Sequence, residues 1–377
     1  MIFKKINAWV HLWFGIASGI VVVVLGITGC ILVFEQEIRN VSSPWHHAES
    51  NGKALLPPSK IQEAVLKVLP HKEVHSVWYY GENRTAQVTV NSDSTVFVDP
   101  YTAKVVAMVD HEDFFHLVEE GHFYLWLPKE IGSVIVGWGT FIFFILLLSG
   151  LVLWWPKRWN KKGRDQSFKI KWKARFKRLN YDLHNVLGFY SIIVALLFAI
   201  TGLMMSFQWF NKGVFWIAGG TDKARIEAVS DTLNNPQTKM LEQVDQAWYK
   251  GMNELAAHNP KEIIVSFPEK ASEAIYVCTD MFNGTWRDVY LDQHTLEVLP
   301  ASNKKLMDEN FADLIRRLNY GVHIGAIGEL PTKILFFIVS LICASLPITG
   351  FVIWWGKKKK SGKKKRRIFM KPYPSVS

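Results

Sequence analysis

Four long apolar runs constrain the fold of this 377-residue chain more than any other feature. Each run is long enough to cross the hydrocarbon core of a bilayer, which takes about 20 apolar residues in a helix. They predict a membrane α-helical bundle of four transmembrane helices. The runs cover residues 9–34, 133–155, 184–207 and 332–355.

The basic residues gather beside these runs. The formal net charge is +11, and 44 Lys and Arg residues are present. Many of them lie in three blocks: Lys4 and Lys5, residues 157–178, and residues 357–371. Because cytoplasmic ends of membrane helices carry an excess of Lys and Arg, this placement predicts that both termini are cytoplasmic. It indicates contact with the lipid bilayer and no binding of nucleic acid.

Two polar segments separate the runs, and both are expected on the periplasmic side. The first has an amphipathic helical pattern at 58–69 followed by alternating strand patterns. The second has a helical pattern at 241–257 followed by strands near 262–267 and 274–279. Each segment therefore predicts an α+β module.

The chain repeats itself, which predicts an internal duplication. The first and third apolar runs correspond at an offset of 173, and the second and fourth at an offset of 200. A Ser/Thr-Gly pair near the end of each run is interpreted as a helix-packing feature, since small residues allow helices to approach closely. Thr28-Gly29-Cys30, near the end of the first run, resembles a lipoprotein cleavage site. The recurrence of Ile-Thr-Gly later in the chain predicts that this helix is retained. The corresponding positions are His11, Gly15 and Thr28 with His184, Gly188 and Thr201, and 150–155 with 350–355.

The expected organisation alternates helices with modules. It comprises transmembrane helix 1 (1–34), module 1 (35–132), transmembrane helix 2 (133–156), a basic cytoplasmic loop (157–183), transmembrane helix 3 (184–207), module 2 (208–330), transmembrane helix 4 (331–356) and a basic cytoplasmic tail (357–377).

These features resemble the PepSY-associated transmembrane (PepSY_TM) family. The resemblance rests on a histidine followed by a glycine four residues later, on Thr-Gly or Ser-Gly before Trp-Trp, and on the Asp99-Pro100 turn of a PepSY-like module. Ala103 stands where the family turn has glycine, and Gln293 stands where the second turn has proline. The resemblance implies an inner-membrane protein similar to di-haem ferric-siderophore reductases.

Histidines at the helix ends are the candidate haem-iron ligands, because a neutral imidazole is a standard axial ligand. The expected pairs are His11 with His184 at the cytoplasmic end and His122 with His323 at the outer end. His116 competes with His122. Gly15 and Gly188, one turn from their histidines, are expected to leave room for the flat macrocycle. The alternative is that each histidine only reaches toward the lipid headgroups.

Other expectations concern cofactors and partners. The three cysteines form no haem-attachment motif, so two haem b groups are expected to bind non-covalently. The expected substrate is a ferric siderophore or another ferric chelate, cationic or neutral because acidic residues outnumber basic ones in the modules. The electron donor, a cytoplasmic protein or a quinol, is not identified, and no Rossmann fingerprint is present. No catalytic residue is assigned.

Two further functions stay open. The chain could be a non-enzymatic PepSY binding or regulatory protein, similar to protease-inhibiting propeptides, with its helices as anchors. It could also be an iron-chelate transporter, although its apolar runs lack interior charges. The remaining histidines are expected to be solvated surface residues: His46, His47, His71, His75, His111, His258 and His294.

Overall fold

The computed structural model describes residues 2–90, 94–110, 113–221, 227–231, 240–257, 259–281 and 284–369. His111 and His258 lie outside the described residues. The chain divides into two compact units. A helical unit comprises Met1–Val33, Val118–Phe210 and Pro331–Ser377, and a sheet unit comprises Phe34–Leu117 and Asn211–Leu330.

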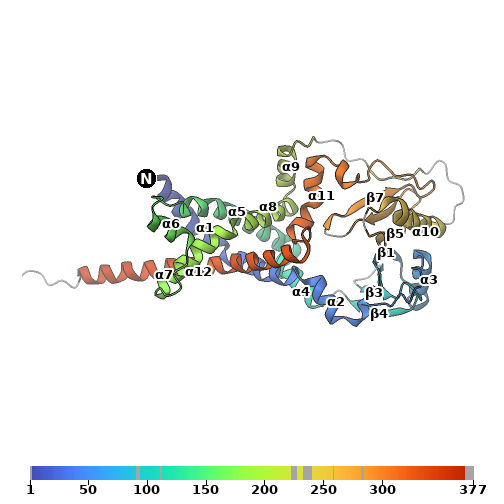
Figure 1. Cartoon of the computed structure of the whole chain (residues 1–377), viewed down its shortest axis with the longest axis horizontal. Helices are drawn as coiled ribbons and strands as arrows, with labels where there is room; N and C mark the ends of the chain where they lie inside the picture. Colours follow the sequence, from blue (N-terminus) through green and yellow to red (C-terminus); the bar gives the residue numbers. More distant parts are fainter. Residues whose placement is uncertain are drawn as a thin grey trace, which may run out of the picture. The chain divides into compact units, whose positions relative to one another are not determined.

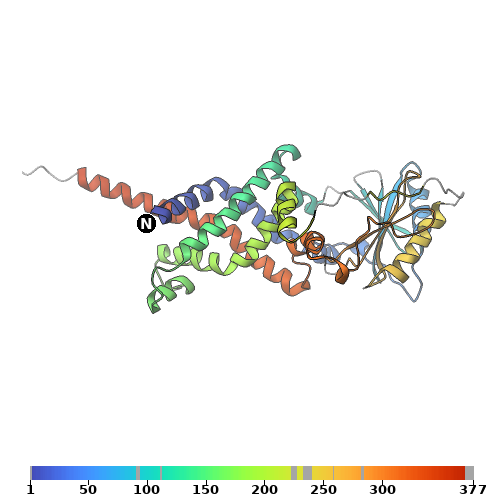
Figure 2. The same ribbon diagram turned by 90° about the horizontal axis from the view of Figure 1, so that it is seen from above.

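The helical unit contains the four transmembrane helices that the apolar runs predict (Figure 1, Figure 2). All four candidate spans have a mean hydropathy of 2.4. The third span is continuous through α7, one π-helical turn and α8. The elements are α1 (Ile2–Leu32), α5 (Lys129–Trp154), α6 (Lys161–Phe168), α7 (Phe176–Asp182), η2 (Leu183–Leu187), α8 (Gly188–Ser206) and α12 (Glu329–Phe369), with α4 (Phe114–Tyr124) at the boundary between the units.

Small residues let the helices of the bundle approach closely. Gly26 of α1 faces α12, where an added Cβ would lie 2.8 Å from Ala344 Cβ and 3.0 Å from the carbonyl oxygen of Ser340. The Ser340 hydroxyl donates to the Gly26 carbonyl at 3.0 Å. Gly139 of α5 meets Val21 of α1 in the same way. Because lipid tails are as apolar as the helices, such close packing supplies much of the association energy.

The strands of the two polar segments form one antiparallel sheet in the sheet unit. The strand order is β4-β3-β2-β1-β5-β6-β7, and Tyr80 of β1 lies opposite Glu262 of β5. The two segments were expected to form separate modules, so the pairing of β1 with β5 is not predicted from the sequence. Without it, β1 and β5 would each leave a row of unpaired backbone groups at an edge. The strands are β1 (Val74–Tyr80), β2 (Ala86–Val90), β3 (Ser94–Val98), β4 (Val105–Asp110), β5 (Glu262–Ser266), β6 (Ile275–Thr279) and β7 (Arg287–Leu291).

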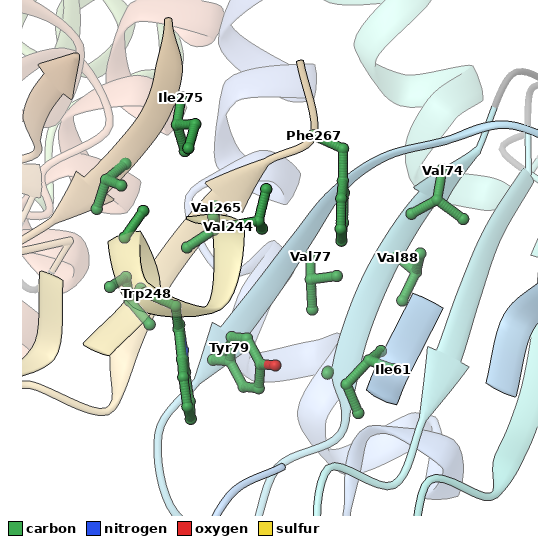
Figure 3. Close-up of a cluster of buried hydrophobic side chains, with 14 of the residues drawn as sticks. Ile61, Val74, Val77, Tyr79, Val88, Val244, Trp248, Val265, Phe267 and Ile275 are labelled. Atoms are coloured by element: carbon green, nitrogen blue, oxygen red, sulfur yellow. The ribbon is translucent and has the colours of Figure 1, made fainter. Parts of the chain in front are cut away.

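Helices α3 and α10 cover the sheet with one shared core (Figure 3). Ile61 of α3 and Trp248 of α10 are almost fully buried there. The rings of Trp248 and Tyr79 lie 5.2 Å apart, and the Tyr79 hydroxyl donates to the Leu56 carbonyl at 2.8 Å. The remaining elements of this unit are α2 (Glu35–Ser42), η1 (Pro44–His46), α3 (Pro58–Val68), α9 (Gln208–Ile217), α10 (Met240–Lys250), η3 (Gly251–Leu255), η5 (Leu306–Asp308) and α11 (Phe311–His323).

The Asp99 turn holds a non-glycine residue in a left-handed conformation. Ala103 has φ +59°, and its amide donates to the Asp99 carbonyl at 2.9 Å. A left-handed alanine costs about 1–2 kcal/mol, of which the greater chain entropy of unfolded glycine offsets about 0.4–1 kcal/mol. Ala103→Gly is therefore expected to stabilise the sheet unit by roughly 0.5–1 kcal/mol. Hydrogen exchange at the amides of β3 and β4 measures this change, and faster exchange would contradict it.

His46 is not the solvated residue that the sequence analysis expects, because its side chain is buried against Phe97 with the two rings 4.9 Å apart. Burial, with smaller contributions from Arg84, Arg39 and His47, lowers the pKa of His46 from 6.5 to about 4.

This burial predicts a pH-dependent stability of the sheet unit. The unfolded chain takes up a proton near pH 6.5, whereas folded His46 resists protonation until about pH 4. The stabilisation is complete above pH 6.5 and is lost as the pH falls toward 4, by about 1–2 kcal/mol after allowing for solvent screening. Thermal unfolding at pH 7.5 and pH 5 measures this loss. His46→Phe is expected to flatten the profile, and an unchanged slope would exclude His46 as its source.

Candidate functional site

His11 and His184 face each other within the helical unit. His11 lies on α1, and His184 lies in the π-helical turn at 183–187, a distortion that is frequent at functional sites. Their ring centroids are 6.4 Å apart, and the ring planes are nearly perpendicular at 87°. The structure thus brings together the two side chains that the sequence pairs at the cytoplasmic end.

A hydroxyl group on a neighbouring helix holds each of these rings by its Nδ1 atom. His11 Nδ1 lies 2.7 Å from Ser149 Oγ of α5. His184 Nδ1 lies 2.9 Å from Thr349 Oγ1 of α12 and 3.1 Å from the carbonyl oxygen of Leu346. Within the described parts of the chain, no hydrogen bond engages the Nε2 atom of either ring. Both rings therefore leave Nε2 available on the side away from their anchors.

The glycine after each hydroxyl residue makes room for the ring. An added Cβ at Gly150 would lie 3.3 Å from His11 Cε1, and one at Gly350 would lie 3.2 Å from His184 Cε1. The Ser/Thr-Gly pairs thus have a second use that the sequence analysis does not predict. They seat the histidines, and their expected role in helix packing stays a prediction.

An asparagine one turn before each histidine ties the same helices together. The Asn7 side-chain amide donates to the Ser149 carbonyl at 2.9 Å, and that of Asn180 donates to the Thr349 carbonyl at 3.0 Å. Asn7 and Asn180 differ by 173 positions, as His11 and His184 do. The sequence carries this signal, but the sequence analysis does not use it.

The spacing of the two rings fits a metal ion held between them. Two imidazoles bonded to one metal ion at about 2.0 Å each place their ring centroids roughly 6.3 Å apart. No group of three or more His, Cys, Asp and Glu side chains suited to a metal ion occurs among the described residues. Two axial nitrogens are what a haem iron takes from a protein, because the porphyrin supplies the other four ligands.

Gly15 and Gly188 lie one turn further along their helices. An added Cβ would contact Leu146 at 4.0 Å in the first case and Leu346 at 3.6 Å in the second, both at ordinary van der Waals distances. Their role beside a macrocycle stays a prediction.

Comparison with known proteins identifies the family of the chain. The family described as the PepSY-associated TM region matches residues 8–357. The chain belongs to this family. Its match spans all four membrane helices and both polar segments, as the resemblance in sequence implies. No curated protein matches the chain.

His122 of this PepSY_TM chain is seated as His11 and His184 are. Its Nδ1 atom lies 2.8 Å from Thr28 Oγ1, and an added Cβ at Gly29 would lie 3.6 Å from its Cε1. Burial lowers the pKa of His122 to about 4, so the ring is neutral, as a metal ligand must be. This anchor favours His122 over His116 as a ligand. Because His323 belongs to the sheet unit, the pair of His122 and His323 stays a prediction.

Proposed function

We propose that the chain is a b-type haem protein of the bacterial inner membrane, which carries electrons from the cytoplasmic side to the periplasm and reduces ferric siderophores. The observation that carries this proposal is the pair of facing rings, 6.4 Å apart, that each present an unengaged Nε2 atom. An isolated interfacial histidine needs neither a facing partner nor an anchor on its Nδ1 atom. Ionisable side chains within membranes are usually functional.

Two haem positions would form the electron path. His11 and His184 would hold the first haem, and His122 and His323 the second. Two separate positions are supported by the spacing along α1, where Thr28, the anchor of His122, follows His11 by 17 residues, or about 25 Å of helix. That length approaches the roughly 30 Å thickness of the hydrocarbon core.

The residues of the chain would hold and orient the haem, and the haem supplies one-electron redox chemistry when bound. Ser149 and Thr349 orient the rings, while the apolar helices exclude water from the path. Reduction releases iron because the hard oxygen ligands of siderophores hold Fe(III) better than Fe(II). The chelate would bind the sheet unit, which we place in the periplasm with both chain termini in the cytoplasm.

We also infer that the chain arose by internal duplication. The two halves carry equivalent anchors: Asn7, His11 and Ser149 in the first, and Asn180, His184 and Thr349 in the second. Both Asp turns support this inference as well. Asp99 and Asp292 each accept hydrogen bonds from backbone amides two or three residues later. The residue four positions after each aspartate, Ala103 or Leu296, has a left-handed conformation.

Haem content and electron delivery test the function. Protein expressed with haem available is expected to show a Soret band and about two haems per polypeptide by the pyridine-haemochrome assay. After anaerobic reduction with dithionite and desalting, it is expected to reoxidise on addition of a ferric hydroxamate, with ferrozine capturing the Fe(II). The absence of a Soret band would remove the proposal. Bound haem that no ferric chelate reoxidises would leave electron transfer but exclude the siderophore as acceptor.

A further inference from the structure

The hydroxyl groups that hold the histidines also form hydrogen bonds to carbonyl groups of their own helices. Ser149 Oγ donates to the Leu146 carbonyl at 3.0 Å, and Thr349 Oγ1 donates to the Ser345 and Leu346 carbonyls, both at 3.0 Å. Such bonds to carbonyls one turn earlier are usual for hydroxyl residues within helices. A hydroxyl has one proton, so an oxygen that donates it to the carbonyl can only accept from the nearby ring.

This arrangement favours the tautomer in which Nδ1 carries the ring proton. For His184 the argument is independent of the hydroxyl, since the Leu346 carbonyl, 3.1 Å from Nδ1, can only accept. A neutral imidazole protonated at Nδ1 has an unprotonated Nε2 with a free lone pair.

We propose that Ser149 is a positioning residue that locks His11 in the Nδ1–H tautomer, and that Thr349 together with the Leu346 carbonyl does the same for His184, so that each ring presents an unprotonated Nε2 to the haem iron before the haem arrives. The part of this proposal that concerns haem rests on the proposed function, whereas the tautomer does not. A hydrogen bond from Nδ1 also makes the ring a better electron donor, which stabilises Fe(III). The Ser/Thr-Gly pair is thus a histidine seat, in which the hydroxyl selects the tautomer and the glycine admits the ring.

The tautomer can be measured without haem. Nitrogen-15 NMR of histidine-labelled apoprotein at pH 7.5 is expected to show His11 and His184 protonated at Nδ1. Ser149→Ala is expected to release His11 to the Nε2–H form, whereas Ser149→Thr retains the hydroxyl and the Nδ1–H form. Thr349→Val is expected to leave His184 protonated at Nδ1, because the Leu346 carbonyl still accepts from that atom. Thr140→Val is the matched control, because Thr140 of α5 also donates to a carbonyl one turn earlier, that of Val136, and among the described residues no hydrogen bond joins it to a histidine.

Haem binding gives the second readout. Loss of an outer hydrogen-bond partner typically weakens metal binding by about 10- to 100-fold. Ser149→Ala is expected to show such a loss of haem affinity and a more positive midpoint potential, which Ser149→Thr restores. Wild-type rings protonated at Nε2, or Ser149→Ala behaving as Thr140→Val does, would overturn the inference. Nδ1–H rings in a protein that binds no haem would uphold the tautomer and remove the proposed function.

Discussion

Replacing His184 with alanine is expected to lower the haem content from about two to about one per polypeptide, and replacing His11 is expected to do the same. The two rings lie 6.4 Å apart, and in the proposed function they would hold a single iron. The loss of either ring leaves that iron with one axial ligand. The pyridine-haemochrome assay and the height of the Soret band measure the change.

The double variant gives the sharper test. If both rings hold one haem, His11→Ala combined with His184→Ala loses no more haem than either change alone, because residues that share one site are not additive. His71→Ala is the matched control, since His71 is exposed in a turn of the sheet unit. Wild-type haem content in both single variants would refute the ligand assignment. A loss that doubles in the double variant would instead place the rings in separate sites.

Substituting Gly26 is expected to disrupt the helical unit. The Cβ of Gly26→Ala would lie 2.8 Å from Ala344 Cβ and 3.0 Å from both the Ala344 nitrogen and the Ser340 carbonyl oxygen. Two of these atoms are backbone, so the helices themselves must move apart. Overpacking of this kind costs about 1–3 kcal/mol, and Gly26→Val is expected to cost more. Thermal unfolding of the detergent-solubilised protein measures the loss.

Gly213→Ala is the contrasting control, and its stability is measured by the same thermal unfolding. Gly213 lies within α9, and an added Cβ there meets no described atom within 4 Å. Alanine is favoured over glycine in a helix by about 1 kcal/mol, so this variant is expected to be neutral or slightly stabilised. If Gly26→Ala unfolds at the same temperature as Gly213→Ala, close contact between α1 and α12 is not a source of stability.

The sequence predicts the membrane helices well because their signal is local. An apolar run of about 20 residues has few folds open to it. The predicted run at 9–34 appears as Ile2–Leu32, which starts earlier because Lys4 and Lys5 continue the helix beyond the apolar run. The pairing of His11 with His184 was also predictable, because the internal repeat gives the two histidines equivalent positions in helices of one bundle.

The contacts that depend on non-local geometry escape prediction. Whether β1 pairs with β5 depends on which edges meet in three dimensions, and nothing in the strand pattern of either segment specifies it. The seat of His11 combines α1 with α5, and Ser149 is ordinary in composition until its neighbour across the bundle is known. The burial of His46 likewise depends on Phe97, 51 positions away in the chain.

The seam between β1 and β5 has a consequence for synthesis of the protein. Each half of the chain provides one ring of the facing pair and one side of the seam, so either half alone would leave an open strand edge and a single imidazole. Carrying both halves on one polypeptide fixes their ratio at one to one. Every copy of the chain that is synthesised therefore contains the partner that each half requires.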